Sequence, residues 1–241
     1  MPQGLGVRVS PSAPINSQPD QRRMSKKQTI IKQIAKEVKN RLEGESSGHD
    51  WWHTAKVWSM AKRIGEKERA DMFVVELAAL LHDIADWKFY DGDDTIGPRV
   101  AGKILNKYKV SKEITEKVQK IISMISFKGA RVKTGQQILE GTVVQDADRL
   151  DALGAIGIAR VFAYSGFKNR PIYIPGEKPI FHQTKESYVK KSGSAINHFY
   201  EKLLLLKKLM NTKTAKKLAE ERHRFMKRYL DQFFREWNSK A

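Results

Sequence analysis

Apolar residues recur every three or four positions along most of the chain, which is the spacing that buries one face of an α-helix. In the first such segment Ile30, Ile31, Ile34 and Val38 follow this spacing, and the pattern ends near Leu42. The intervening positions are mostly Lys, Gln and Glu, which suit the solvent side of such a helix. The pattern therefore predicts an amphipathic helix near the start of the folded chain.

Further helices follow, and several have a residue before them that can cap the first turn. Asp50 and Asp71 precede two of these helices, where a carboxylate oxygen can accept hydrogen bonds from unpaired N–H groups. The helix after Asp71 is apolar nearly all round, which indicates a buried helix rather than a surface one. The predicted helices span residues 25–42, 51–67, 72–86, 98–108, 112–127, 136–160 (as one or two helices) and 194–237 (in two pieces that separate near Asn211).

No useful length of the chain shows the alternation of apolar and polar residues that is typical of a β-strand. The sequence therefore predicts an all-α fold, built as a compact helical bundle. Residues 165–193 are rich in Gly and Pro and predict a long loop, and loops of that size are usually functional or mobile. Residues 1–24 predict a disordered leader or tag, and residues 25–241 a single domain that includes the C-terminal helical segment.

The charge balance is compatible with an anionic partner. The 241 residues carry 45 Lys and Arg against 27 Asp and Glu, for a formal net charge of +18, and residues 194–241 alone hold 12 basic and 5 acidic residues. Such a surplus is typical of proteins that meet nucleotides, nucleic acids or acidic membrane faces. A Lys-rich helical surface in water explains the same surplus equally well. The charge alone therefore does not establish that the protein binds an anionic partner.

The composition excludes several classes of protein. The chain has no cysteine, so a disulfide framework, a thiolate zinc site and a cysteine nucleophile are all excluded. No apolar run approaches the roughly 20 residues of a membrane-spanning helix. We therefore expect no membrane partner and a cytoplasmic location, and the sequence leaves both a monomer and a homodimer open.

Ionisable residues stand inside three apolar helical segments. A buried carboxylate is costly unless it is paired or binds a metal. Imidazole nitrogens and carboxylate oxygens suit divalent Mn, Fe, Co, Ni or Zn, and such an ion would lower the pKa of its water and polarise a phosphoryl group. Each residue alone is more simply a buried histidine or a structural acid, whereas the whole set in this order favours a metal site. The set comprises His53, His82, Asp83, Asp146, Asp148 and Asp151.

The order of these residues resembles the HD-domain superfamily of metal-dependent phosphohydrolases. An H-x-x-K-V segment (53–57) precedes the HD pair (82–83), and A-D-R-L (147–150) follows it. Longer stretches are similar to one bacterial branch, the HD-domain nucleotide pyrophosphohydrolases, over about residues 28–237. These stretches are HDWWH (49–53), ELAALLHDIADWKF (76–89), ISFKG (125–129), VVQDADRLDALGAIGIAR (143–160), INHFYEKLL (196–204) and TKTAKKLAEERHRFM (212–226).

The resemblance implies a metal site between core helices. Its ligands would be His53, His82, Asp83 and Asp148, holding one divalent ion, with Mn²⁺ favoured and Mg²⁺, Co²⁺, Ni²⁺ or Fe²⁺ as alternatives. Spacing alone leaves Asp146 as a rival for the last position, whereas the A-D-R-L match favours Asp148, with Asp146 or Asp151 as a supporting or structural acid. The segment IISMISF (121–127) lacks the extra histidine that HD enzymes with two metals bring, which favours a single ion.

The resemblance also implies residues that act on the substrate. Asp86 lies four residues after His82 and shares its helix face, so we assign it to orient or deprotonate the attacking water. The alternative is an acid at the end of the helix, beside Lys88. Four cations near the motifs are candidates to bind phosphate, although Arg149 could instead pair with an acid. These cations are Lys56, the leading candidate, with Lys88, Lys128 and Arg149.

Together these features predict a metal-dependent phosphohydrolase that acts on a small anionic nucleotide, most simply by cleaving a nucleoside triphosphate to release pyrophosphate. A nucleoside monophosphate phosphatase or a cyclic phosphodiesterase of the same fold remains open. A non-catalytic module that binds nucleic acid is an alternative of another class, supported by the basic C-terminal segment. The complete set of metal-ligand candidates favours the enzyme, because a binding module does not need that set.

Overall fold

The computed structural model describes residues 25–44, 50–85, 90, 93–125, 135–136, 138–181 and 193–240. Every regular element in these ranges is helical, which confirms the predicted all-α fold. The predicted leader, residues 1–24, lies outside the described residues. The division into a leader and one domain therefore stays a prediction.

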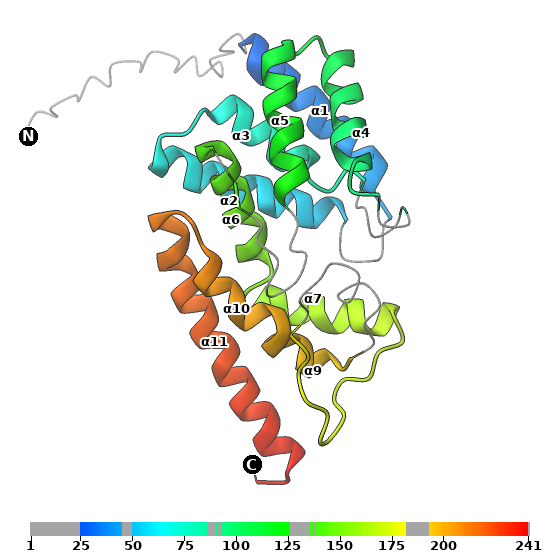
Figure 1. Cartoon of the computed structure of the whole chain (residues 1–241), viewed down its shortest axis with the longest axis vertical. Helices are drawn as coiled ribbons and strands as arrows, with labels where there is room; N and C mark the ends of the chain where they lie inside the picture. Colours follow the sequence, from blue (N-terminus) through cyan, green and yellow to red (C-terminus); the bar gives the residue numbers. More distant parts are fainter. Residues whose placement is uncertain are drawn as a thin grey trace, which may run out of the picture.

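One group of helices, at the top of Figure 1, comes from the first half of the chain. Its central member is α3, which packs against three others of the group and against α6 of the second half. Eight of the ten residues of α3 are buried, as its apolar sequence predicts. The members are α1 (Lys26–Leu42), α2 (Trp51–Glu68), α3 (Met72–Leu81), α4 (Ile96–Lys107) and α5 (Lys112–Ile125).

The second half of the chain starts in this group and then leaves it. α6 (Leu139–Asp151) packs against α2, α3 and α5, and α7 (Gly154–Phe167) turns away from it by 70°. The bend lies at Gly154, whose φ of +74° is readily adopted by glycine. The segment predicted as one or two helices is therefore two. The chain continues through α9 (Ala195–His198), the π-helix η2 (Phe199–Leu203), α10 (Leu204–Leu206) and the 3₁₀-helix η3 (Lys207–Leu209).

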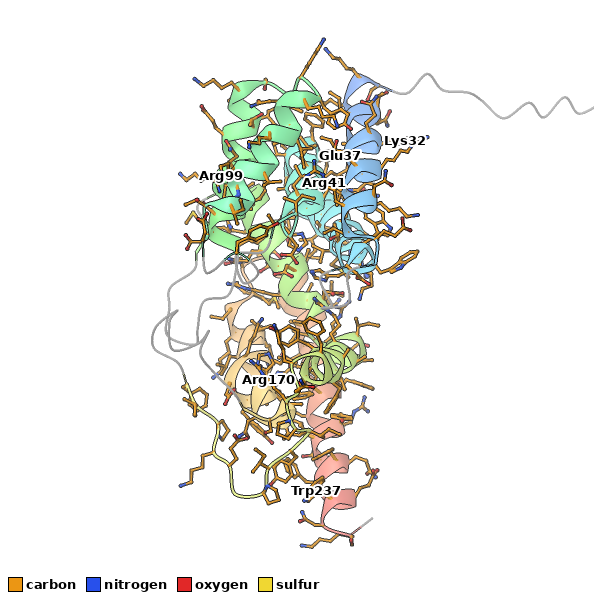
Figure 2. The ribbon with its side chains drawn as sticks, turned by 90° about the vertical axis from the view of Figure 1, so that its right-hand side faces the viewer. Lys32, Glu37, Arg41, Arg99, Arg170 and Trp237 are labelled. Carbon is orange, nitrogen blue, oxygen red and sulfur yellow. The ribbon has the colours of Figure 1, made fainter. Side chains whose placement is uncertain are left out.

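The long last helix, α11 (Lys213–Trp237), runs from the first group of helices to the later helices of the chain. It contacts α2, α6 and α7, and its far end carries Trp237. Figure 2 shows Trp237 at the opposite end of the molecule from Glu37 and Arg41 of α1. The predicted break near Asn211 is confirmed, because η3 ends at Leu209 and α11 begins at Lys213.

The predicted caps are present, but one helix is shorter than predicted. Asp50 and Asp71 accept hydrogen bonds from the first turns of α2 and α3, at 2.9 and 3.0 Å. The prediction that the third helix runs to residue 86 is wrong, since α3 ends at Leu81 and residues 82–85 form turns. The tighter Ile84 N–H to Leu81 carbonyl bond, at 3.2 Å, replaces the helical pattern there. The HD pair thus lies just beyond the end of a buried helix.

The apolar side of α6 belongs to the core. Val143, Val144, Ala147 and Leu150 of α6 are all 0% exposed. Among the described residues no single helix is both long and apolar enough to cross a membrane, and α6 and α7 meet that test only as a bent pair. Burial in this fold accounts for the apolar side of α6.

Candidate metal centre

His53 enters the site from the first turn of α2. The Asp50 carboxylate caps this turn by accepting a hydrogen bond from the His53 backbone N–H at 2.9 Å. The histidine is 2% exposed. Its Nδ1 lies 2.7 Å from Asp151 Oδ2, so the imidazole donates its Nδ1 hydrogen to that carboxylate. The other nitrogen, Nε2, then faces the centre of the site with its lone pair.

His82 and Asp83 enter from the turn after α3. His82 is 4% exposed, and its Nδ1–H donates to the Ala79 carbonyl at 2.8 Å. This bond directs His82 Nε2 toward His53 Nε2, at 3.3 Å. Asp83 Oδ2 lies 3.2 Å from His53 Nε2 and 3.3 Å from His82 Nε2. Two imidazole nitrogens and a carboxylate oxygen therefore converge on one point.

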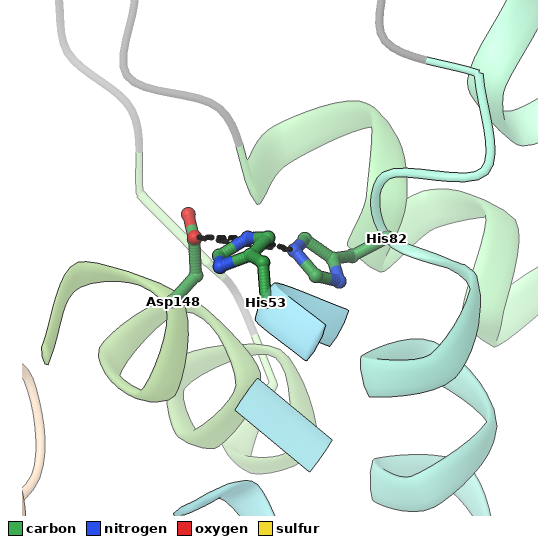
Figure 3. A group of neighbouring side chains, drawn as sticks. All are labelled: His53, His82 and Asp148. Carbon is green, nitrogen blue, oxygen red and sulfur yellow. Dashed lines mark hydrogen bonds and ion pairs between the residues drawn. The ribbon is translucent and has the colours of Figure 1, made fainter. Parts of the chain in front are cut away.

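Asp148 completes the cluster from α6. Its Oδ1 lies 3.6 Å from His53 Nε2 and 3.9 Å from His82 Nε2, and Figure 3 shows the three side chains pointing toward one another. The ligand atoms of His53, His82 and Asp148 all lie within 4.8 Å of one another. The Asp148 side chain is 30% exposed, so the cluster has one edge open to solvent. This arrangement is able to hold a divalent ion.

Asp151 supports the cluster from behind His53. Besides accepting from His53, its carboxylate contacts Lys56 Nζ and Arg160 Nη1, each at 2.8 Å. Burial opposes ionisation of Asp151, but its hydrogen bonds to His53 and Lys56 and the charge of Arg160 hold its pKa below the usual value. A carboxylate that fixes the tautomer of a ligand histidine is a common feature of metal sites. Besides the candidate ligands, the site thus contains a carboxylate, Asp151, that holds the ring of His53 in place.

The carboxylates of the cluster change the pKa of His82. Burial of its ring opposes protonation, but the carboxylates of Asp83 and Asp148 outweigh this effect and raise the pKa of His82 to about 9. Without an ion, the site therefore neutralises part of its negative charge with a proton on His82. A divalent cation would fill the same electrostatic need.

Asp146, the rival for the last ligand position, faces away from this cluster. It is 0% exposed and accepts hydrogen bonds from four donor groups, the backbone N–H and side chain of both Asn211 and Thr212, at 2.7–3.1 Å. These two residues immediately precede α11, and Thr212 is its N-cap. The contacts give Asp146 a structural role that joins α6 to the last helix.

Comparison with known proteins agrees with this geometry. The family model described as HD domain matches residues 51–153. The protein YpgQ of Bacillus subtilis is 44% identical over 202 residues, which are 83% of this chain and 90% of YpgQ. The chain belongs to the HD-domain family. The matched range contains His53, His82, Asp83 and Asp148, as well as the supporting Asp151.

Solved structures of HD-domain proteins share the fold. An HD-superfamily hydrolase from Bacillus thuringiensis is 43% identical with a TM-score of 0.68, over 88% of this chain and 98% of that one. YpgQ in complex with ADP is 41% identical with a TM-score of 0.66, over 86% and 97%. A protein from Lactobacillus plantarum is 39% identical with a TM-score of 0.78, over 88% and 98%. These relatives support an HD-superfamily hydrolase.

The cations predicted to bind substrate have different surroundings in this HD-domain protein. Lys56 is exposed and paired with Asp151. Arg149 is 5% exposed and donates to the Leu209 carbonyl, which is a structural contact. Lys88 and Lys128 lie outside the described residues, so nothing in the structure bears on them. The assignment of all four to substrate stays a prediction.

The predicted catalytic acid, Asp86, also lies outside the described residues, and its role stays a prediction. Sequence reasoning missed Arg160, which shares Asp151 with His53 and Lys56. Its signal is a single cation in the otherwise apolar segment GAIGIARVFA (154–163). A cation at that position indicates a buried acid on a neighbouring element.

Proposed function

We propose that this HD-domain protein is a metal-dependent phosphohydrolase of small nucleotides that cleaves nucleoside triphosphates to monophosphates and pyrophosphate. The observation that carries the proposal is the cluster of His53, His82, Asp83 and Asp148, with an open edge at Asp148. Nucleotide chemistry is supported by the relative YpgQ, which has been crystallised with ADP. The absence of cysteine fits the cytoplasm as the proposed location.

The residues present fit a divalent ion. Both histidines donate Nδ1–H to a fixed acceptor, Asp151 or the Ala79 carbonyl, so their Nε2 atoms face the two carboxylates and are the atoms that would bind an ion. Mixed nitrogen and oxygen donors suit Mn²⁺, which we propose as the ion, and also Co²⁺, Ni²⁺, Fe²⁺ or Mg²⁺. When bound, such an ion polarises phosphoryl oxygens and lowers the pKa of a water molecule.

In the proposed reaction a water oxygen forms a bond to the α-phosphorus. The bond from that phosphorus to the bridging oxygen breaks, and pyrophosphate leaves with the bonding electrons. Asp86 is proposed to take the proton from the water. The negative charge that develops on the phosphate oxygens is offset by nearby cations, for which Lys56 is the leading candidate, followed by Lys88, Lys128 and Arg149.

The test is a nucleotide panel in which the products are identified. Full-length protein is incubated with nucleoside triphosphates, nucleoside monophosphates and cyclic nucleotides, each with Mn²⁺, Mg²⁺, Co²⁺ or Ni²⁺, and the products are separated by anion exchange. We expect pyrophosphate and monophosphate from a triphosphate, with the highest rate in Mn²⁺. Orthophosphate from monophosphates, or opening of a cyclic nucleotide, would instead identify one of the alternative activities.

The matched variants are Asp83→Ala in the cluster and Asp231→Ala, which removes an exposed acid of α11. We expect Asp83→Ala to lower the rate by about a hundredfold or more with an unchanged circular dichroism spectrum, and Asp231→Ala to keep the wild-type rate. If the wild-type protein were inactive with every metal and nucleotide, the proposed enzymatic function would be wrong. If the inactive protein also bound RNA with a steep salt dependence, the result would favour the alternative function, a non-catalytic module that binds nucleic acid.

A further inference from the structure

A cavity lies behind the metal cluster, on the other side of Asp151. Its volume is about 280 Å³, near the small end of the roughly 300–1,000 Å³ that is typical of ligand sites. It lies between α2 and α6, with α7 and α11 closing it. The lining residues are Lys56, Ser59, Met60, Arg63, Ala147, Asp151, Ile156 and Arg222.

Three cations from two helices line this cavity. Lys56 and Arg63 come from α2 and Arg222 from α11. Among the described residues that line it, Asp151 is the only acid, and its carboxylate already contacts His53, Lys56 and Arg160. The positive charge of the cavity is therefore larger than its own acid can balance.

The two arginines are close enough to affect each other. Arg222 is fixed because its guanidinium donates to the Leu150 carbonyl and its stem lies where a side chain at Gly154 would stand. Burial lowers the pKa of Arg222, Asp151 opposes this, and the like charge of Arg63 lowers it further. Arg63 is exposed and forms no ion pair with any residue that the structure describes. An anion between the two guanidiniums would relieve their repulsion.

The rest of the lining suits a small ligand that is held by its charge. The Ser59 hydroxyl can donate a hydrogen bond, while Met60, Ala147 and Ile156 form an apolar wall. Guanidinium groups bind phosphate oxygens in pairs, which an ammonium group cannot do. Two arginines, a lysine and a hydroxyl thus provide the donors that a phosphate group requires.

The cavity is separate from the metal cluster. The His53 ring contacts Asp151 through Nδ1 and the cluster through Nε2, and both residues are buried. This pair forms the wall between the two sites. Along α2 the cavity extends from Lys56 to Arg63, a rise of about 10 Å at 1.5 Å per residue, in the direction away from His53.

We propose that this cavity is a second site, which binds a small phosphate-bearing anion of the size of pyrophosphate between Lys56, Arg63 and Arg222. The site goes beyond the proposed function, because binding here needs neither a metal nor turnover. Lys56, the leading cation of the proposed function, also lines this cavity and contacts Asp151, so the two sites share this one lysine.

The test is calorimetric titration of inorganic pyrophosphate into the full-length protein after divalent ions have been removed by chelation. Under this condition the metal cluster exposes the carboxylate of Asp148 and does not attract an anion. We expect saturable binding with one site per chain, tighter than binding of orthophosphate. We also expect the melting temperature to rise with pyrophosphate concentration, as ligand binding to the folded state requires.

Three variants decide whether the cavity is the site. Arg63→Gln should weaken pyrophosphate binding about tenfold, because it removes one charged hydrogen-bond donor. Lys67→Gln removes the same charge from an exposed position one turn further along α2 and should change the affinity less than twofold. Asp148→Ala, in the metal cluster, should likewise leave the affinity within twofold.

The outcomes decide whether the cavity binds the anion and which source of phosphate it accepts. Binding that Arg63→Gln leaves unchanged, or the absence of saturable binding to folded wild-type protein, would overturn the proposal. AMP distinguishes the source of the phosphate group. If AMP binds as tightly as pyrophosphate and is equally weakened by Arg63→Gln, the cavity accepts a nucleotide phosphate, whereas weaker AMP binding identifies a site for the inorganic anion. Neither result depends on whether the protein hydrolyses nucleotides.

Discussion

Asp146 and Asp148 lie two residues apart on α6 but belong to different regions, a buried hydrogen-bonded junction and the partly open metal cluster. Asp146 is fully buried, and its carboxylate accepts hydrogen bonds from the backbone and side chains of Asn211 and Thr212. Asp148 has a side chain that is 30% exposed and lies 3.6 Å from the Nε2 of His53. At 100° per residue the two side chains leave the helix about 200° apart. One faces the start of α11 and the other faces the metal cluster.

The difference shows what separates a structural acid from a ligand. The oxygens of Asp146 already receive hydrogens from fixed donors, so a metal ion would have to displace them and leave those donors unpaired. The neighbours of Asp148 are imidazoles whose other nitrogens are occupied by Asp151 and the Ala79 carbonyl. Their Nε2 atoms can share an ion with Asp148. The partners, more than the residue type or the motif, assign the role.

The largest expected effect is the loss of stability in Asp146→Ala. This variant removes the acceptor of donor groups on Asn211, which is exposed, and on Thr212, which is buried. A donor left buried without a partner costs about 1–3 kcal/mol, so we expect a total loss of roughly 2–4 kcal/mol. Urea unfolding of the metal-free protein should report this loss. The Mn²⁺ affinity of the variant that remains folded should stay within a few-fold of wild type.

The reciprocal variant, Asp148→Ala, should show the opposite pattern. We expect its Mn²⁺ affinity to fall by about a hundredfold, measured by calorimetry. The free energy of unfolding without metal should change by less than about 1 kcal/mol, since the Asp148 carboxylate is partly exposed and its contacts to the two histidines are long, at 3.6 and 3.9 Å. The comparison fails if the two variants lose stability and metal affinity in the same proportion.

The sequence allowed the helices and the order of the cluster to be predicted, because both depend on local signals. Apolar spacing located the helices, and the H-x-x-K-V, HD and A-D-R-L segments identified His53, His82, Asp83 and Asp148. A structural role for Asp146 was one expectation, but its partners could not be predicted, since they come 65 and 66 residues later. Spacing within DADRLD (146–151) gives no information about such distant donors.

Two other features were beyond local reasoning for related reasons. α3 ends at Leu81 although its apolar pattern continues, because a side-chain bond from His82 to the Ala79 carbonyl competes with the helix at that point. The cavity beside Asp151 is formed by helices from both ends of the chain. Arg63 and Arg222 have ordinary helical surroundings in the sequence, and only the fold brings them together.

A smaller effect, confined to the open cluster, is the pH dependence of metal binding. The carboxylates of Asp83 and Asp148 outweigh burial and raise the pKa of His82 to about 9. A ligand histidine must be neutral, so below pH 9 the ion displaces a proton, and affinity should fall about tenfold for each unit of decreasing pH. Above pH 9 this dependence should disappear, because His82 is then already neutral.

Calorimetry between pH 6.5 and 8 tests this sign directly. Titration of Mn²⁺ in two buffers of different ionisation enthalpy should show release of about one proton per ion or more. An affinity that stays constant over this range, with no proton release, would contradict a charged His82 in the metal-free site. Asp146→Ala should show the same dependence of Mn²⁺ affinity on pH, because Asp146 lies outside the cluster. A changed dependence would mean that the two regions are electrostatically coupled.

The smallest expected effect comes from a single hydroxyl of the structural region. Thr212 Oγ1 donates to Asp146 Oδ2 at 2.8 Å and accepts from the Ala215 N–H at 3.1 Å, so it caps α11 while it holds the acid. Thr212→Val keeps the shape and removes both bonds, which should lower the free energy of unfolding by about 1–2 kcal/mol. Asp146 still keeps its backbone donors in this variant, so the loss should be smaller than that of Asp146→Ala. Thr212→Ser is the matched control, because it retains the hydroxyl, and it should recover most of the stability in the same urea titration. If Thr212→Val were as stable as wild type, the hydroxyl would contribute nothing to this junction, and the backbone N–H groups and the Asn211 side chain alone would hold the Asp146 carboxylate.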